Sequence, residues 1–375
     1  MRFSIERVDL LKSMTVTNGV AERNPAIPVL ANVLIEATDG KVSFRASDAK
    51  LEVIFWADAQ IEQTGHTTVS AHLLHEIARK MPQGAMIELD TDANVGRLTV
   101  SAGRAIFKLA TLPGDDFPLM QRHEFDCGFS LPVGSFRPLV GKTRFSMSQD
   151  DSRKYLNGVY LHIVPGDESE SGMLRCVATD GHRLALASMD VPDGAETMPG
   201  IIVPQKTVGE LLKVLEDTEE QLHVSVSEKI VQFELPSITM TSNVVEGTFP
   251  QYENVIPKNN ENRLEIDRSA FIEAVDRVTT VSTERDTEAV TVAIETDLVK
   301  LNLNTVDKGT ADEEVAAAYS GNPMKMGFNG SYLKDVSQHI DQSSVVFWLN
   351  SPEEPALVRD GDDTSSLFVV MPMRI

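Results

Sequence analysis

The chain has 375 residues, a length that favours two or three domains over one small module. Hydrophobic residues make up 42% of the sequence and charged residues 24%, which is ordinary globular usage and excludes a disordered chain. The net charge of −22, from 34 basic and 56 acidic residues, disfavours DNA or an acidic membrane as a partner when it is taken as a total.

The sequence shows no pattern typical of a signal segment, a membrane span, a disulfide framework or a metal-binding cluster. Residues 1–11 contain no apolar signal core, and no run of 18 apolar residues occurs anywhere. Cys127 and Cys176 lie far apart and belong to no CxxC or Cys/His cluster. We therefore expect a cytoplasmic protein with no disulfide, no metal site, no cofactor and no membrane partner.

A short alternating strand that leads into a helix occurs three times along the chain. These copies lie at residues 2–11, 128–137 and 263–272. A second strand–helix element follows each of them, at residues 69–74, 203–208 and 328–333. A Phe-Pro pair also repeats, at residues 117–118 and 249–250. The copies are spaced by roughly 125 to 135 residues, which is the length of a domain and not of a solenoid repeat.

Each repeat has two amphipathic helical segments separated by period-two runs, such as residues 40–46, 173–178 and 298–304. Such runs are typical of half-buried antiparallel strands. The fold class expected is α+β, with the same arrangement of helices on a sheet repeated three times. Polar stretches at residues 121–127 and 257–262 read as linkers, so we expect domains at residues 1–126, 127–260 and 261–375.

The predicted helices carry basic side chains opposite their apolar stripes. These are Lys12, Arg79, Lys142, Lys206, Lys213, Arg277 and Lys334. Any solvent-exposed helix face shows such charges, and acidic residues share these faces. However, the six helices together are net positive whereas the rest of the chain is strongly negative, and that segregation suits a phosphate backbone.

Three motifs offer alternative functions. Residues 141–143 (GKT) resemble the end of a phosphate-binding loop, but the upstream glycine spacing fails. Asp180 and His182 form a possible general acid/base pair, so an acid/base or metal-dependent hydrolase is the alternative function; the same DG pair also favours a turn. Acidic doublets at residues 115–116, 150–151 and 362–363 lack calcium-loop spacing and read as solvated turns.

The last nine residues, 367–375, are apolar almost to the end. A chain end is normally polar and frayed. Two interpretations remain open: a core strand that finishes at the surface, or one wall of a groove for a hydrophobic peptide, where Met371 and Met373 would offer adaptable contacts.

Longer stretches resemble the bacterial DNA polymerase III beta subunit family, the replicative sliding clamps, along the whole chain. They are FSIER (3–7), FSM (145–147), YLNG (155–158), ATDGHRL (178–184), TFP (248–250), YSG (319–321), GFN (327–329) and VVMPMR (369–374). The resemblance implies a head-to-tail homodimeric ring of three clamp domains per chain, with helices inside and antiparallel sheets outside. It implies a non-catalytic processivity factor that encircles double-stranded DNA without reading sequence and tethers the polymerase III alpha subunit, the clamp loader, other polymerases and repair proteins.

The resemblance also implies a groove for partner peptides between the second and third domains. Its walls would be Arg153, Leu156, Thr179, Gly181, His182, Arg183, Leu184, Pro250, Val255, Asn329, Tyr332, Val369, Val370, Met371, Pro372, Met373 and Arg374. Asn254 stands where the family has a basic residue and Ile375 replaces a terminal Leu, so their effect on peptide affinity stays open.

DNA contacts in the family involve a loop that matches Gln149, Arg153, Lys154 and Tyr155, in addition to the basic helix faces. The family also has a DNA-contacting arginine near the first Pro-rich turn. In this chain Asn24 occupies that position, and the nearest arginine is Arg23, one position earlier. Phe107 and Leu109 match apolar positions of the family's dimer interface.

Overall fold

The structure is a computed structural model that describes residues 1–375 except 93–95, 121–123, 167–171, 216–219, 283–288, 307 and 362. It divides into two compact units, Met1–Arg137 with Pro192–Val244, and Pro138–Val191 with Val245–Ile375. Part of the expected linker at residues 121–127 and part of the acidic doublet at 362–363 lie outside the described residues.

The first unit contains the first repeat together with residues 127–137 and 192–244 of the middle repeat. Its elements are β1 (Arg2–Glu6), α1 (Arg7–Val20), β2 (Asn32–Thr38), β3 (Lys41–Ser47), β4 (Leu51–Asp58), β5 (Gln60–Gln63), β6 (Gly65–Ser70), α2 (Ala71–Lys80), β7 (Met86–Asp92), β8 (Arg97–Ala102), β9 (Ala105–Leu112), β10 (Cys127–Pro132), β14 (Ile201–Pro204), α4 (Gln205–Val214), β15 (Gln221–Val226), β16 (Ile230–Leu235) and β17 (Ile238–Asn243). Helix α3 (Val133–Gly141) begins in this unit and ends in the other.

The second unit contains residues 138–191 and 245–260 of the middle repeat and all of the last repeat. Its elements are the short 3-10 helices η3 (Arg144–Ser146), η4 (Asp151–Leu156) and η5 (Tyr252–Val255), with β11 (Gly158–Val164), β12 (Met173–Thr179), β13 (Arg183–Asp190), β18 (Asn262–Asp267), α5 (Arg268–Thr279), β19 (Ala289–Ile294), β20 (Leu298–Thr305), β21 (Gly309–Tyr319), β22 (Met324–Asn329), α6 (Gly330–Gln338), β23 (Ser344–Leu349), β24 (Ala356–Asp360) and β25 (Asp363–Val370).

Each unit has one antiparallel sheet that crosses a boundary between repeats. The described strands of the first unit run in the order β10-β15-β16-β17-β4-β3-β2-β6-β9-β8-β7-β1-β5. Those of the second include the run β11-β12-β13-β25-β24-β23-β18-β21-β20-β19-β22. The joining pairs are β17 with β4, where Met240 lies opposite Val53, and β13 with β25, where Ala185 lies opposite Phe368.

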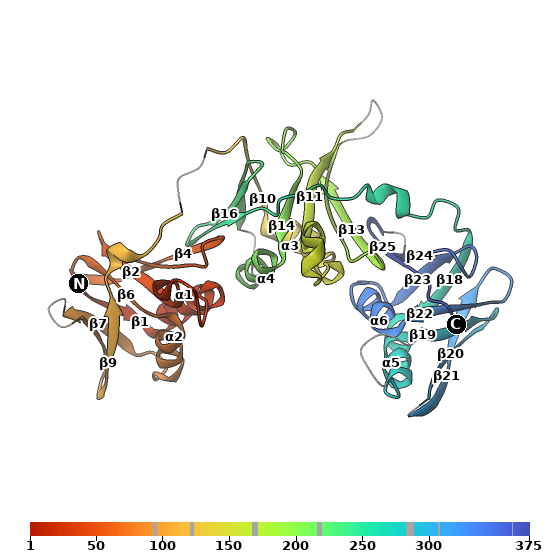
Figure 1. Ribbon diagram of the computed structural model, residues 1–375, viewed down its shortest axis with the longest axis horizontal. Helices are drawn as coiled ribbons and strands as arrows, with labels where there is room; N and C mark the ends of the chain where they lie inside the picture. The colour runs from red at the N-terminus through yellow and green to blue at the C-terminus, as the bar shows by residue number, and fades with distance from the viewer. Residues whose placement is uncertain are drawn as a thin grey trace. The chain divides into compact units, whose positions relative to one another are not determined.

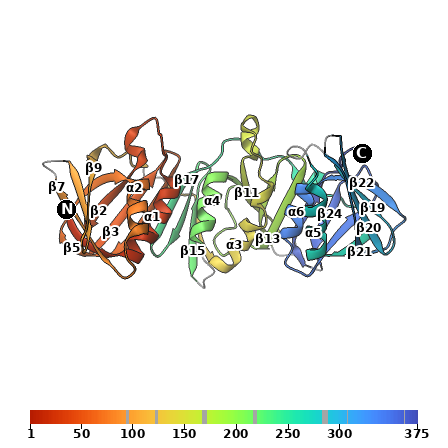
Figure 2. The ribbon, with the colours of Figure 1, turned by 90° about the horizontal axis from the view of Figure 1, so that it is seen from below.

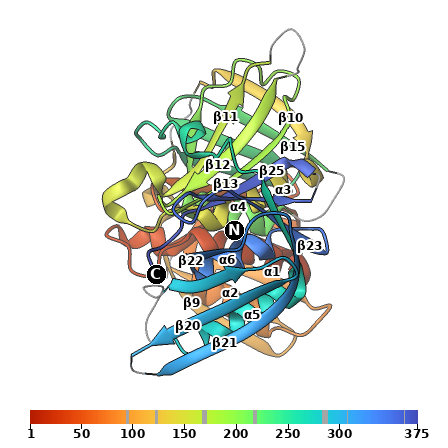
Figure 3. The same ribbon diagram turned by 90° about the vertical axis from the view of Figure 1, so that its right-hand side faces the viewer.

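The helices pack on the sheets through their apolar stripes. Helices α1 and α2 contact each other, and α1 contacts β3 and β4, as Figures 1 and 2 show for the first unit. In the second unit, α5 contacts α6, β20 and β21 (Figure 3). Leu10, Met14 and Leu74 of the first unit are completely buried, as amphipathic spacing predicts.

Side chains at the ends of the preceding strands cap the N-termini of several of these helices. The Asp267 carboxylate accepts a hydrogen bond from Ala270 N (2.8 Å) at the start of α5. The Asn329 side chain accepts from Ser331 N (2.8 Å) at the start of α6. Such N-caps satisfy backbone donors that have no partner within the helix. The α+β prediction, with two helices in each repeat, is confirmed.

We predict that Phe368→Ala destabilises the second unit by about 3–5 kcal/mol, because Phe368 is completely buried at the β13–β25 junction. Urea denaturation would measure the change in the free energy of unfolding. The control, Val306→Ala, removes a fully exposed side chain and should stay within about 0.5 kcal/mol of the parent. A Phe368→Ala loss as small as that of the control would contradict the assignment of Phe368 to the core.

Candidate functional site

The turn between β12 and β13 is held by the side chains of Thr179 and Asp180. Asp180 Oδ1 accepts hydrogen bonds from the backbone N–H groups of His182 (2.8 Å) and Arg183 (3.0 Å). Gly181 N donates to Thr179 Oγ1, and Gly181 has φ of +91°, a conformation that favours glycine. The Asp180 carboxylate thus forms a turn, and its contact with His182 runs through the backbone.

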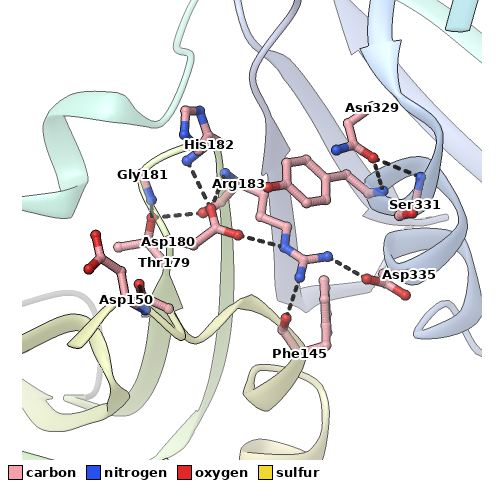
Figure 4. Close-up of polar contacts among 12 residues, drawn as sticks. Phe145, Asp150, Thr179, Asp180, Gly181, His182, Arg183, Asn329, Ser331 and Asp335 are labelled. Atoms are coloured by element: carbon pink, nitrogen blue, oxygen red, sulfur yellow. Dashed lines mark hydrogen bonds and ion pairs between the residues drawn. The ribbon is translucent and has the colours of Figure 1, made fainter. Parts of the chain in front are cut away.

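Arg183 connects this turn to two other parts of the second unit (Figure 4). Its Nε donates to Asp180 Oδ2 (3.0 Å), its Nη1 to Asp335 Oδ2 of α6 (2.5 Å) and its Nη2 to the carbonyl of Phe145 (2.7 Å). The guanidinium carbon also lies 4.3 Å from the centroid of the Tyr332 ring. A planar guanidinium suits this combination of fork-like hydrogen bonds and ring stacking, which a lysine would not reproduce.

A cavity of about 150 Å³ lies beside the turn, at the β13–β25 junction. Nine residues predicted as groove walls line it: Leu156, Thr179, Gly181, Arg183, Leu184, Pro250, Val255, Val369 and Met371. Gln251 and Tyr252 also line it, and neither was predicted. The lining is mostly apolar with a few polar groups, which is the usual character of a ligand pocket.

The other predicted groove residues lie around the cavity or away from it. Arg153 Nη1 donates to the Asp180 carbonyl (3.0 Å), and His182 is exposed. Asn329 caps α6, while Tyr332 lies against Arg183. Val370 is completely buried in the core.

The C-terminal segment resolves the two interpretations of its apolar character into one arrangement. Phe368 and Val370 are buried core residues of β25, and Val369 and Met371 line the cavity. Met373 N then donates to the carbonyl of Gly327 (2.8 Å), while Pro372 and Arg374 flank it. The segment is therefore both a core strand and a cavity wall.

An aromatic cluster adjoins the cavity through Tyr252, which lines it. Tyr252 is buried, and its hydroxyl lies 3.0 Å from His162 Nε2 and 3.3 Å from Arg175 Nη1. Tyr160 stacks on Phe249, with ring centroids 4.8 Å apart. Burial raises the pKa of Tyr252 to about 12 and lowers the pKa of His162. The sequence signal here was the repeated Phe-Pro pair, which says nothing of Tyr252.

The predicted basic residues fall into two groups. Most have a carboxylate partner: Arg79 with Glu76, Lys142 with Asp341 and Asp360, Arg153 with Asp150, Lys206 with Asp48, Lys213 with Glu210, Arg277 with Glu273 and Glu313, and Lys334 with Asp276. For Lys12, Arg23 and Lys154, which are exposed, no carboxylate partner occurs in the described ranges. Gln149 and Tyr155 are also exposed.

The predicted dimer residues lie on β9. Phe107 is 38% exposed, whereas Leu109 on the same strand is only 7% exposed. Ile106, which was not predicted, is the more prominent apolar side chain there, at 64% exposed.

Two negative findings apply to the part of the chain that the structure describes. There, no helix is both long and apolar enough to cross a bilayer. In the same residues, no group of three or more His, Cys, Asp or Glu side chains is placed to hold a metal ion.

Comparison with known proteins accounts for the whole chain. The N-terminal, central and C-terminal domains of the DNA polymerase III beta subunit match residues 1–121, 130–251 and 253–374, respectively. A beta sliding clamp from Caulobacter vibrioides is 40% identical and one from Escherichia coli K12 is 33% identical, each over the full length of both chains.

Solved structures agree with these matches. A sliding clamp from Bartonella birtlesii, solved bound to griselimycin, superposes with a TM-score of 0.95 at 40% identity and covers both chains completely. A Pseudomonas aeruginosa clamp superposes with a TM-score of 0.91 at 34% identity, again over both full chains. The chain therefore belongs to the DNA polymerase III beta subunit family, the replicative sliding clamps, which consist of three clamp domains and act as non-catalytic processivity factors.

Proposed function

We propose that two copies of this chain form a closed ring around double-stranded DNA and hold DNA polymerase III on its template. The single observation that carries the proposal is the full-length match to three consecutive clamp domains. We assign the domains to residues 1–126, 127–260 and 261–375, with the helices inside the ring and the sheets outside. We propose the cytoplasm as its compartment.

Two strand edges support a head-to-tail dimer. Residues 105–110 of β9 pair with β8, and residues 309–316 of β21 pair with β20; in the described part of the chain their other edges have no strand partner. The β9 edge carries Lys108, and the β21 edge carries Asp312 and Glu314. Opposite charges on two free edges favour pairing of one copy's β9 with its partner's β21 over self-pairing.

Partly neutralised basic side chains suit a ring that slides. Residues proposed to face DNA are Lys12, Arg23, Arg79, Gln149, Arg153, Lys154, Tyr155, Lys213, Arg277 and Lys334. Several are exposed and paired with carboxylates, for example Arg277, which is held by Glu313 and Glu273. Contacts with phosphate would then be weak and screened by salt, which allows movement without sequence preference.

The apolar cavity at the β13–β25 junction is the proposed docking site for partners. A short hydrophobic peptide segment matches its lining, and Arg153 and His182 of the adjacent turn region supply polar groups. We assign the exposed Arg374 to the same site. We assign the polymerase III alpha subunit, the clamp loader, other polymerases and repair proteins to this site. The pairing of Asp180 with Arg183 and with the turn amides disfavours the hydrolase alternative.

We predict that the protein, loaded on nicked circular DNA by a clamp loader, is released when the circle is linearised. A ring held by topology slides off free ends, whereas a protein bound by direct contacts does not. Gel filtration with radiolabelled protein measures the fraction of protein that stays on the DNA and elutes with it. Protein that stays on linear DNA as well as on circles contradicts the ring.

A charge reversal on the β9 edge refines this test. Lys108→Glu should weaken the dimer and shorten retention on circles, whereas Lys41→Glu, on an exposed end of β3, should do neither. Analytical ultracentrifugation would measure the dimer dissociation constant. Equal dissociation constants for the two variants would remove the proposed edge pairing.

We predict that Val255→Asp lowers the affinity for the polymerase III alpha subunit at least about tenfold, because a carboxylate in an apolar pocket costs at least about 1.4 kcal/mol of binding free energy. Val255 is 43% exposed, so the fold should tolerate the change. Surface plasmon resonance with the alpha subunit measures the dissociation constant. The control Ile27→Asp, at another exposed apolar site, should bind normally; if both variants bind normally, the groove assignment is wrong.

We predict that part of the protein's loss of stability in acid comes from the protonation of His162. Its pKa lies below 6.5 in the folded protein because of burial, so below about pH 6.5 the unfolded chain takes up a proton that the native imidazole does not. Stability from His162 is therefore complete above pH 6.5 and falls as the pH drops through the folded pKa. NMR titration of the His162 imidazole would measure that pKa, and His162→Gln should flatten the pH dependence of urea unfolding. An imidazole pKa at or above 6.5 would refute the prediction.

A further inference from the structure

We propose that Lys142 and Lys206 fasten the central segment, residues 130–251, to its two neighbours, and that neither ammonium group contacts DNA. Both were expected on the DNA face from their helical-wheel positions. The fastening role stands on the contacts of the two side chains, and only the exclusion from DNA rests on the proposed function.

Lys206 connects α4 to the β3–β4 turn. Its Nζ donates to Asp48 Oδ2 (2.5 Å) and to the carbonyl of Val20 (2.9 Å), the last residue of α1. The Asp48 side chain is only 9% exposed. A lysine on a helix's final carbonyl also complements the negative end of the helix dipole.

Asp48 holds its own turn at the same time. Its Oδ1 accepts hydrogen bonds from Lys50 N (2.9 Å) and Leu51 N (2.8 Å). Between them and Asp48, Ala49 has φ of +71°, a conformation unfavourable for a residue with a side chain. Asp180 makes the same pair of turn hydrogen bonds in the next repeat, where its second oxygen binds Arg183.

Lys142 makes the matching contact at the other boundary of the central segment. Its Nζ lies 2.8 Å from Asp341 Oδ2 and 3.4 Å from Asp360 Oδ2, and it donates to Ser366 Oγ (3.4 Å). The Lys142 side chain is 14% exposed and that of Asp360 is 2% exposed. Burial alone would lower the pKa of Lys142, but the hydrogen bonds and charges of Asp341 and Asp360 leave it raised.

Asp360 is also a turn-forming carboxylate. It ends β24, Gly361 follows with φ of +58°, and its two oxygens accept from Gln342 N (2.9 Å) and Asp341 N (2.8 Å). Removal of the Lys142 ammonium would leave a buried carboxylate with backbone donors alone, which is costly.

The two contacts share one design. In each, an ammonium from the central segment reaches a carboxylate that closes a hairpin of a flanking segment. A strand of that same hairpin pairs with the central segment, β4 with β17 and β25 with β13. Two kinds of contact thus cross each boundary, a strand ladder and an ion pair. A phosphate would have to displace these partners, and for Lys142 it would have to enter a nearly buried site.

The test uses the full-length dimer with Lys142→Met and Lys206→Met, and Lys12→Met as the matched control, since Lys12 is exposed on α1. Hydrogen exchange followed by NMR should speed up at least about tenfold at the amides of residues 341 and 342 in Lys142→Met. It should speed up similarly at residues 50 and 51 in Lys206→Met, and at neither place in Lys12→Met. Unchanged exchange at these amides overturns the fastening role.

The salt dependence of retention on circular DNA tests the second part of the proposal, that neither Lys142 nor Lys206 contacts DNA. The slope of log affinity against log salt should become shallower by about 0.9 in Lys12→Met, the change expected when one phosphate is no longer neutralised, and stay at the parent value in the two other variants. A slope that becomes shallower in Lys142→Met or Lys206→Met as it does in Lys12→Met overturns the exclusion from DNA. If none of the three changes the slope while local exchange is faster, the proposed DNA face fails and the fastening role stands.

A second substitution tests the Lys142 contact in case Lys142→Met does not fold. Asp341→Asn changes the exposed partner, 77% exposed, and leaves the buried Asp360 paired. It should speed exchange at residues 341 and 342 by a smaller factor. No change in Asp341→Asn when Lys142→Met cannot be purified also counts against the proposal.

Discussion

The backbone pairing of β13 with β25 is the constraint on which the candidate site depends. Residues 183–187 lie opposite residues 366–370, and this ladder joins two sequence repeats in one sheet. It places the start of β13 beside the end of β25, so Leu184, Val369 and Met371 line one cavity. Without the ladder, these residues would belong to separate surfaces.

Polar side chains then fix the geometry around that ladder. Arg183 binds Asp180, Asp335 and the Phe145 carbonyl at once, so the turn, α6 and the segment after α3 share one guanidinium. Elsewhere in the cavity lining, the hydroxyl of the buried Tyr252 lies within hydrogen-bond distance of both His162 and Arg175. The apolar lining is thus presented by groups that have little freedom to move, which reduces the ordering cost of binding.

Local patterns in the sequence predicted the repeats, the helix pairs and the α+β class, because period and spacing report which face of an element is buried. They did not predict which strands pair across repeats, since that depends on residues far apart in the chain. The same limit explains Lys142 and Lys206. A helical wheel puts them toward solvent, but their acceptors Asp360 and Asp48 lie 218 and 158 residues away in sequence. Tyr252 was missed because its position follows no period, whereas much of the cavity wall came from the family resemblance alone.

The sharing of sheets between repeats has a mechanical consequence. To bend at either boundary, the chain would have to shear a main-chain ladder and part an ion pair together, so both boundaries are stiff. In a ring built from two such chains, the edges where one chain meets the other would be held by no covalent link. A loading machine that opened the ring at those edges would leave both strand ladders, and the cavity at the β13–β25 junction, intact.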